Sequence, residues 1–276
     1  MAQRSVLITG CSSGIGLDAA RTLAARGWRV LATCRAEADC DRLRAEGLES
    51  FRLDYADPGS IAQGAARARE LAGGRLAALF NNGAYAIPGF IEDLPTDALR
   101  AIFEANFFGW HDLTRRVLPA MRAQGAGRIV QCSSVLGFAP ARWRGAYVAT
   151  KHALEGYTDC LRLEMRGLPI HVSLIEPGPI TTRFNINALK AFDRWIDRED
   201  SARREELDGI RARYAQGDGP PNRFELPPSA VTARLIHALE SPRPRDRYYV
   251  TMPTYLVAAL RRVAPRRALD WVMARN

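Results

Sequence analysis

The stretch Thr9-Gly10-Cys11-Ser12-Ser13-Gly14-Ile15-Gly16 lies between an apolar run of strand length, residues 5–9, and a helical pattern that begins at Leu17. Glycine at positions 10, 14 and 16 permits a tight turn from strand to helix, close approach of the backbone to a pyrophosphate, and close packing of helix on sheet. The free N–H groups at the start of the helix then face the phosphates. This context predicts a dinucleotide-binding loop rather than a glycine-rich turn without a ligand.

From this loop onward, short apolar runs alternate with helix-length amphipathic segments. Near-continuous apolar strands separated by helices indicate a parallel sheet that is covered on both faces. The predicted class is α/β, in the order βαβαβα. Strands are expected at residues 5–9, 28–34, 50–53, 76–80, 128–132 and 170–175.

The 276 residues suit one large domain, and no repeat or linker divides them. Residues 184–225 carry many charges and scattered aromatics and are too long for a simple connection, which predicts an inserted helical flap over the substrate. Residues 253–276 predict a helical tail in two apolar-faced pieces, split by Pro265. The tail could lie on an anionic membrane surface, close the pocket or pack against another subunit.

The net charge of +9 invites a nucleic-acid function, but the basic residues are spread along the chain, which favours a basic surface or an anionic small ligand. Five cysteines without metal-ligand spacing indicate buried thiols in a reducing compartment, and no metal site is expected. The chain shows no secretory leader and no membrane-spanning apolar run. A cytoplasmic location is therefore the expectation.

The choice of nicotinamide cofactor depends on the end of the second predicted strand. An acidic residue there would bind the ribose hydroxyls of NAD(H), but this chain has Arg35 instead. An arginine can pair with a 2'-phosphate, so the sequence favours NADP(H) over NAD(H).

Tyr147 and Lys151 stand four residues apart, on one face of a helix predicted to run from Gly145 towards Arg166. Lys151 is one of only two lysines in the chain, and the other is Lys190. An ammonium beside a phenol favours the phenolate, so we expect it to lower the pKa of Tyr147 and to suit that group to proton transfer. A lysine fits this role better than an arginine because its charge is compact and its proton can be exchanged.

These motifs resemble the short-chain dehydrogenase/reductase family over nearly the whole chain. Residues 9–16 match the family's TGxxxGxG loop, and Asp54 matches the acidic residue expected beside the adenine. Asn81-Asn82-Gly83-Ala84 stands where the family usually has Asn-Asn-Ala-Gly. Ser134, thirteen residues before Tyr147, resembles the catalytic serine, and Ser133 fits that spacing less well.

The resemblance implies a single Rossmann domain with a doubly wound sheet, and a catalytic set of Asn106, Ser134, Tyr147 and Lys151. Asn106 would hold a water in a proton relay, Lys151 would bind the nicotinamide ribose, and the segment after the sixth strand would meet the nicotinamide. The expected cofactor contacts are Gly10, Ser12, Ser13, Gly14, Ile15, Gly16, Arg35, Asp54, Asn81, Tyr147, Lys151, Pro177, Ile180 and Thr182.

The implied activity is hydride transfer between the nicotinamide and a carbonyl or carbinol carbon, with Tyr147 as general acid or base and Ser134 bonded to the substrate oxygen. An apolar substrate is expected because aromatic residues gather at the candidate pocket walls: Tyr85, Phe90, Phe138, Trp143, Phe184, Phe192 and Trp195.

The pattern at residues 175–180 together with the flap is similar to the branch that acts on retinol, hydroxysteroids and aldehydes. Reduction of 3-oxoacyl thioesters and cofactor sensing without catalysis are the alternatives. The family also implies a homodimer or homotetramer.

Overall fold

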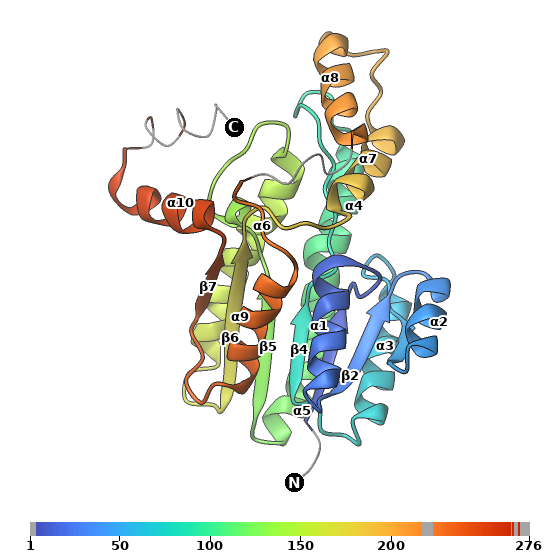
Figure 1. The fold of residues 1–276 in the computed structure, drawn as a ribbon, viewed down its shortest axis with the longest axis vertical. Coiled ribbons are helices and arrows are strands. Elements are labelled where there is room, and N and C mark those ends of the chain that lie inside the picture. The colour runs from blue at the N-terminus through green and yellow to red at the C-terminus, as the bar shows by residue number, and fades with distance from the viewer. Residues whose placement is uncertain (1–3, 217–222, 266, 268–269, 271–276) are drawn as a thin grey trace.

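A seven-stranded parallel sheet forms the centre of the protein (Figure 1) in the computed structural model, which describes residues 4–216, 223–265, 267 and 270. The strands lie in the order β3-β2-β1-β4-β5-β6-β7. Their bounds are β1 (Ser5–Thr9), β2 (Arg29–Cys34), β3 (Glu49–Arg52), β4 (Ala78–Asn81), β5 (Gly127–Cys132), β6 (Ile170–Pro177) and β7 (Arg247–Val250).

Helices connect the strands and extend beyond one end of the sheet. Their bounds are α1 (Gly14–Ala25), α2 (Glu37–Ala45), α3 (Pro58–Leu71), α4 (Thr96–Phe103), α5 (Gly109–Ala123), α6 (Gly145–Glu164), α7 (Phe184–Trp195), α8 (Arg204–Ala215), α9 (Ser229–Glu240) and α10 (Met252–Val263). A π-helical turn, η1 (Glu104–Phe108), joins α4 to α5, and a short 3₁₀ turn, η2 (Val135–Gly137), follows β5.

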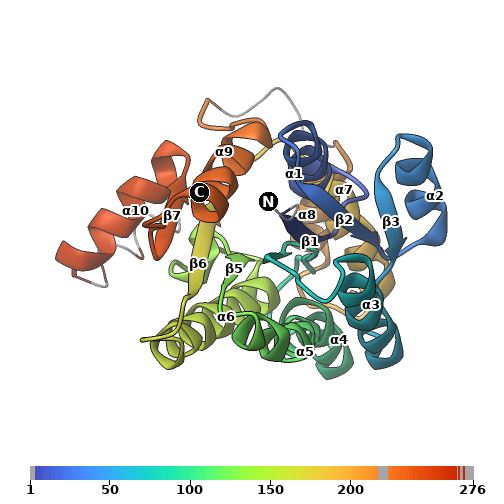
Figure 2. The same ribbon diagram turned by 90° about the horizontal axis from the view of Figure 1, so that it is seen from below.

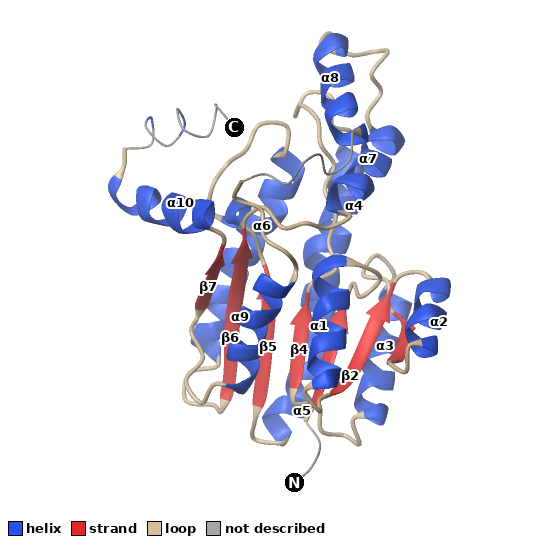
Figure 3. Ribbon diagram, viewed as in Figure 1, coloured by secondary structure: helices blue, strands red, loops and turns tan. Residues whose placement is uncertain are grey.

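The helices cover both faces of the sheet (Figures 2 and 3). α1 and α9 pack together on one face, and α3, α5 and α6 lie on the other. The central strands are mostly apolar and are covered on both sides, and all five residues of β1 are buried. This is the doubly wound α/β architecture that the sequence predicts.

Each of the six predicted strands is present, with bounds that differ from the expected ones by a few residues at most. The seventh strand, β7, was not predicted. Its four residues, Arg247-Tyr248-Tyr249-Val250, alternate between half-buried and buried positions at the edge of the sheet and follow an arginine- and proline-rich loop. So short a run, with an arginine as its first residue, gives no apolar signal of strand length.

The order of the strands reverses between β1 and β4, which are neighbours although two strands separate them in the chain. In such sheets, ligands bind at this switch point, beyond the carboxyl ends of the strands. α7 and α8 occupy the segment expected to form the flap and lie above these strand ends (Figure 1). The switch point and these helices therefore define where the site lies.

The first part of the expected tail is α10, which begins at Met252. The second expected helical piece, after Pro265, falls almost wholly outside the described residues. None of the helices within the described part of the chain has both the length and the apolarity that a membrane crossing requires. The same residues include no group of three or more His, Cys, Asp or Glu side chains suited to hold a metal ion.

Candidate active site

The glycine loop has the backbone that its sequence predicts. Gly10 and Gly14 adopt positive φ angles of 69° and 57°, a region that side chains other than glycine rarely occupy. A Cβ on Gly16 would lie 2.3 Å from the carbonyl oxygen of Gly10. A Cβ on Gly10 would lie 2.6 Å from the Cα of Gly83, so the loop after β4 also depends on this glycine.

The loop offers an anion site of the kind that a dinucleotide pyrophosphate needs. Ser13 caps α1 in an extended conformation, and its side chain makes no capping hydrogen bond to the first turn. The N–H groups of that turn therefore keep their capacity for an anion, and the helix dipole adds positive potential. Thr182 closes the loop from the other side, because a Cβ on Gly14 would lie 2.9 Å from its Cγ2. These residues fit a bound dinucleotide.

Arg35 and Asp54 mark the expected adenosine end of the site. Arg35 is exposed directly after β2 and forms no ion pair with the carboxylates of the described chain. The carboxylate of Asp54 accepts a hydrogen bond from the backbone of Ala56 over 3.1 Å and lies 3.7 Å from Arg52. A free guanidinium thus stands where the sequence predicts a 2'-phosphate contact.

The two asparagines at the end of β4, Asn81 and Asn82, have different surroundings. Asn81 is fully buried, where its Oδ1 accepts from the Tyr55 hydroxyl, and its Nδ2 donates to Thr114 and Gln131. Asn82 instead lines the cavity, and its amide donates to the carbonyl of Thr9 over 3.0 Å. The Asn81 side chain therefore does not reach the cavity, and contact of this residue with the cofactor stays a prediction.

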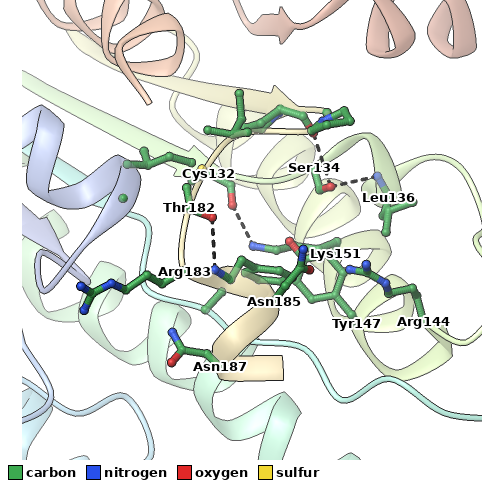
Figure 4. A pocket seen from close by; sticks show the side chains of 18 of the residues that line it. Cys132, Ser134, Leu136, Arg144, Tyr147, Lys151, Thr182, Arg183, Asn185 and Asn187 are labelled. Carbon is green, nitrogen blue, oxygen red and sulfur yellow. Dashed lines mark hydrogen bonds between the residues drawn. The ribbon is translucent and has the colours of Figure 1, made fainter. Parts of the chain in front are cut away.

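A cavity of about 590 Å³ brings together Ser134, Tyr147 and Lys151 beside the glycine loop (Figure 4). Its walls include eleven of the predicted site residues: Gly10, Ser12, Ser13, Gly14, Ile15, Ser134, Tyr147, Lys151, Pro177, Ile180 and Thr182. Gly16, Arg35, Asp54, Asn81 and Asn106 are not among the residues that line it. The hydroxyls of Ser134 and Tyr147 and the amino group of Lys151 therefore lie in the same cavity as the predicted cofactor loop.

Lys151 is buried, with 1% of its surface exposed, and its ammonium is held on two sides. Its Nζ donates to the carbonyl of Cys132 over 2.8 Å and lies 4.3 Å from the centre of the Trp110 ring. Burial lowers the pKa of Lys151 to about 8, although the charge of Glu155 acts in the opposite direction. The amino group is thus able to exchange its proton near neutral pH.

The pKa of the Tyr147 hydroxyl differs from the one that the sequence predicts. Burial raises the pKa of Tyr147 above its ordinary value, while a hydrogen bond with Ser134 and the charge of Arg144 act to lower it. Desolvation is the larger effect because the phenol is enclosed by protein, with Phe184 packed edge-on at 5.3 Å between ring centres. Lys151 is not a significant cause of the shift, so the prediction that the pKa of Tyr147 is lowered is wrong.

Ser134 is fixed from both neighbouring segments. Its Oγ accepts from the backbone of Leu136 over 3.1 Å and donates to the carbonyl of Pro177 at 3.5 Å. Ser133 points elsewhere, since its hydroxyl donates to the carboxylate of Glu155. Both serines line the cavity, but the hydroxyl of Ser133 is engaged by Glu155, so Ser134 is the better candidate to bind the substrate oxygen.

Asn106 lies behind the site, in η1, a type of turn that is often found at functional positions. Its amide exchanges two hydrogen bonds with the backbone of Tyr85, at 3.1 and 2.8 Å, and its Nδ2 lies 3.4 Å from the Thr150 hydroxyl. Thr150 in turn donates to the carbonyl of Tyr147. Asn106 thus ties the loop after β4 to the turn of α6 that carries the reactive pair; its role in a water relay stays a prediction.

An acidic network lies behind the cavity and was not predicted. Arg247 of β7 contacts Glu155, Glu176 and Asp159, and Glu176 is completely buried. Burial raises the pKa of Glu176 to about 8, and the nearby charge of Glu155 acts in the same direction. Sequence reasoning missed this network because its arginine lies on the strand that was also missed.

The substrate end of the cavity is more polar than the sequence predicts. Of the seven aromatic residues expected there, only Trp143 and Phe184 are lining residues, and Tyr214 of α8 joins them. Phe192, on α7 of the flap itself, is buried in a cluster that includes residues of α8, and Phe138 packs against Tyr249 near α10. Most of these rings pack against neighbouring helices and strands instead of facing the cavity, and the sequence does not reveal these contacts.

Comparison with known proteins agrees with this geometry. A family model described as short chain dehydrogenase matches residues 4–191. The chain belongs to the short-chain dehydrogenase family. Its members are oxidoreductases that act on small molecules.

Two relatives show how far the similarity extends. YbbO, an uncharacterized oxidoreductase of Escherichia coli strain K12, is 41% identical over 271 residues, which cover 98% of this chain and 94% of that protein. Human retinol dehydrogenase 8 is 36% identical over 193 residues, which cover 66% of this chain and 61% of that protein.

Solved short-chain dehydrogenases share the fold. One from Streptomyces avermitilis has a TM-score of 0.78 and 29% identity, with 98% of this chain and 96% of that chain covered. A Burkholderia phymatum family member in complex with NAD has a TM-score of 0.77 and 24% identity, covering 99% and 95%. A serine dehydrogenase complexed with NADP⁺ has a TM-score of 0.76 and 24% identity, covering 91% and 95%. Proteins of this fold thus hold either nucleotide.

Proposed function

We propose that this short-chain dehydrogenase is an NADP(H)-dependent oxidoreductase that interconverts a carbonyl group and an alcohol on a substrate with an apolar body. The observation that carries the proposal is the convergence of Ser134, Tyr147 and Lys151 in one cavity beside the glycine loop. Retinol dehydrogenase 8 among the relatives supports a substrate of this class. A protein that only senses the cofactor would not need this set.

Ser134, Tyr147 and Lys151 have separate roles in carbonyl reduction. A bound nicotinamide supplies the hydride. The Ser134 hydroxyl donates a hydrogen bond to the substrate oxygen, and the Tyr147 hydroxyl gives its proton to that oxygen as negative charge develops there. The high pKa of Tyr147 keeps it protonated until then. Lys151, which can exchange its own proton, replaces the one that Tyr147 has given away.

Arg35 supports NADP(H) over NAD(H), because it is exposed at the end of β2 and has no carboxylate partner in the described chain. A 2'-phosphate would satisfy it. Asp54 would contact the adenine, while Gly16 shapes the phosphate loop without facing the cavity.

Other parts of the chain have proposed roles. We place the whole chain in one domain, with residues 184–225 as the substrate flap over the cavity. α10 carries an exposed apolar stripe, Met252, Leu256 and Val263, and the exposed Arg261 and Arg262 come directly before the last of these residues. This stripe favours contact with a second subunit or a membrane surface; a homodimer or homotetramer of a cytoplasmic protein is our proposal.

The test follows NADPH oxidation by the purified protein over a panel of aliphatic aldehydes, retinal, ketosteroids and 3-oxoacyl thioesters. We expect turnover of the first three classes. Turnover confined to the thioesters would replace the proposal with the alternative substrate class. Tight NADPH binding without any turnover would instead identify a cofactor sensor.

A further inference from the structure

The residues that line the cavity carry more positive than negative charge. Four arginines line the cavity as a whole, namely Arg142, Arg144, Arg183 and Arg213. No ion pair joins any of them to a carboxylate among the described residues, although the charge of Arg142 lowers the pKa of Glu206. Glu225 is the acidic residue among the described lining residues, and it has interactions of its own. The glycine loop serves the cofactor phosphates, so the arginines that matter for the substrate are those near Tyr147 and Tyr214, where a neutral carbonyl compound would leave them without an anion.

Arg144 is the best placed of the four. It immediately precedes α6, is half-buried, and lies beside Tyr147 (Figure 4). Its guanidinium carbon is 5.2 Å from the centre of the buried Tyr214 ring. The charge of Arg144 acts on both Tyr147 and Tyr214, and that of Arg213 acts on Tyr214, which places both cations around the same part of the cavity.

The backbone next to Arg144 is strained. Trp143 has a φ of 60°, which is strained for a bulky residue. Its carbonyl accepts a hydrogen bond from Gly89 over 2.9 Å, and Gly89 and Arg144 pair as an isolated parallel bridge. The loop is thus fixed to its neighbour, so the guanidinium is presented beside the reactive phenol rather than released into solvent.

We propose that the substrate carries a negatively charged group, a carboxylate, which Arg144 and Arg213 bind while the carbonyl lies at Ser134 and Tyr147. This inference rests on the proposed function. It narrows the substrate class to oxo acids, or the corresponding hydroxy acids, with an apolar portion against Phe184 and Trp143. A guanidinium pairs well with a carboxylate because it offers parallel N–H donors.

The experiment compares straight-chain oxo acids of increasing carbonyl-to-carboxylate distance with their methyl esters, which keep the shape and lose the charge. NADPH oxidation gives kcat/KM for each member of a pair. For at least one length we expect the acid to exceed the ester by about tenfold or more. Arg144→Gln and Arg213→Gln should each reduce that ratio severalfold, and Arg144→Lys should restore part of it.

Arg166→Gln is the matched control, because Arg166 is exposed, follows α6 and is not a lining residue of the cavity. It removes the same charge and should leave the ratio unchanged. Equal turnover of acids and esters, with a ratio unaffected by Arg144→Gln, would overturn the inference and leave the proposed function intact. If NADPH binds but neither acids, esters nor simple aldehydes are reduced, the proposed function itself fails.

Discussion

The Nζ of Lys151 donates a 2.8 Å hydrogen bond to the backbone carbonyl of Cys132, so a side chain of α6 is fixed to the end of β5, two residues before Ser134. This bond, rather than a contact with Tyr147, positions the ammonium. The closest aromatic ring to it is that of Trp110, and its distance from the Tyr147 ring is 5.6 Å.

Lys151→Arg should therefore lower turnover by about a hundredfold, even though the charge is kept. A guanidinium is too large for a site with 1% exposure over an indole ring, and it does not release a proton near neutral pH. The measurement is kcat for NADPH-dependent reduction, with circular dichroism as a check of the fold. Lys190→Arg, on the exposed face of α7, is the control and should behave as wild type. Normal turnover in Lys151→Arg would exclude any special role for the lysine.

Tyr147→Phe should remove the proton donor and reduce kcat by about three orders of magnitude. The cavity shape changes little, because only a hydroxyl is lost from a ring that remains packed against Phe184. NADPH affinity, measured by fluorescence titration, should stay within a few fold of wild type. A variant that still reduced carbonyls at nearly the wild-type rate would show that another group supplies the proton.

Arg35→Ala tests the choice of cofactor. Loss of a charge-assisted pair with the 2'-phosphate should weaken NADPH binding by about tenfold or more and leave NADH binding nearly unchanged. Arg122→Ala, an exposed arginine at the end of α5, removes the same charge far from the site and should alter neither. Unchanged discrimination between the two nucleotides would count against Arg35 as the determinant.

Gly16→Ala should abolish dinucleotide binding, because the new Cβ would lie 2.3 Å from a backbone oxygen that cannot move without breaking the loop. The free energy of unfolding should also fall by about 2 kcal/mol or more, as is typical of overpacking in a tight site. Gly156→Ala in α6 is a matched change with no atom within 4 Å of its Cβ, and it should leave the protein as stable or slightly more so. Equal nucleotide affinity in both variants would contradict the role given to the loop.

The parts of this protein that could be predicted from sequence are those with short-range signals. The glycine loop, six strands and the Tyr147–Lys151 pair all follow from residue spacing along one element. β7 could not be predicted, since its stability comes from pairing with β6 at the sheet edge rather than from its own pattern. The prediction of the aromatic residues that line the substrate end was largely wrong for a related reason. Whether Phe138 or Phe192 faces a cavity depends on which distant helix packs against it.

The pKa of Tyr147 could not be predicted from the sequence either. Sequence spacing correctly places an ammonium near a phenol but does not reveal that both are buried. Desolvation then dominates over their attraction, raising the pKa of Tyr147 and lowering that of Lys151.

Glu176 gives a prediction about stability and pH. The pKa of its carboxyl is raised from an ordinary 4.5 to about 8, chiefly by burial, so the folded chain holds this proton more tightly than the unfolded chain does. Its contribution to stability is complete below pH 4.5 and is lost as the pH rises towards 8. Glu176→Gln, which mimics the protonated form beside Arg247, should make the free energy of unfolding less dependent on pH over this window.

Urea unfolding between about pH 5 and about pH 7.5 isolates this effect, because Lys151, whose pKa is lowered to about 8, changes stability in the opposite direction above that range. Asp159→Asn removes a half-exposed partner of the same arginine and should retain the wild-type slope. Identical slopes for Glu176→Gln and wild type would mean that Glu176 is ionised in the folded protein throughout. Arg247 would then fully compensate its charge, and burial would not raise the pKa of Glu176 in the folded protein.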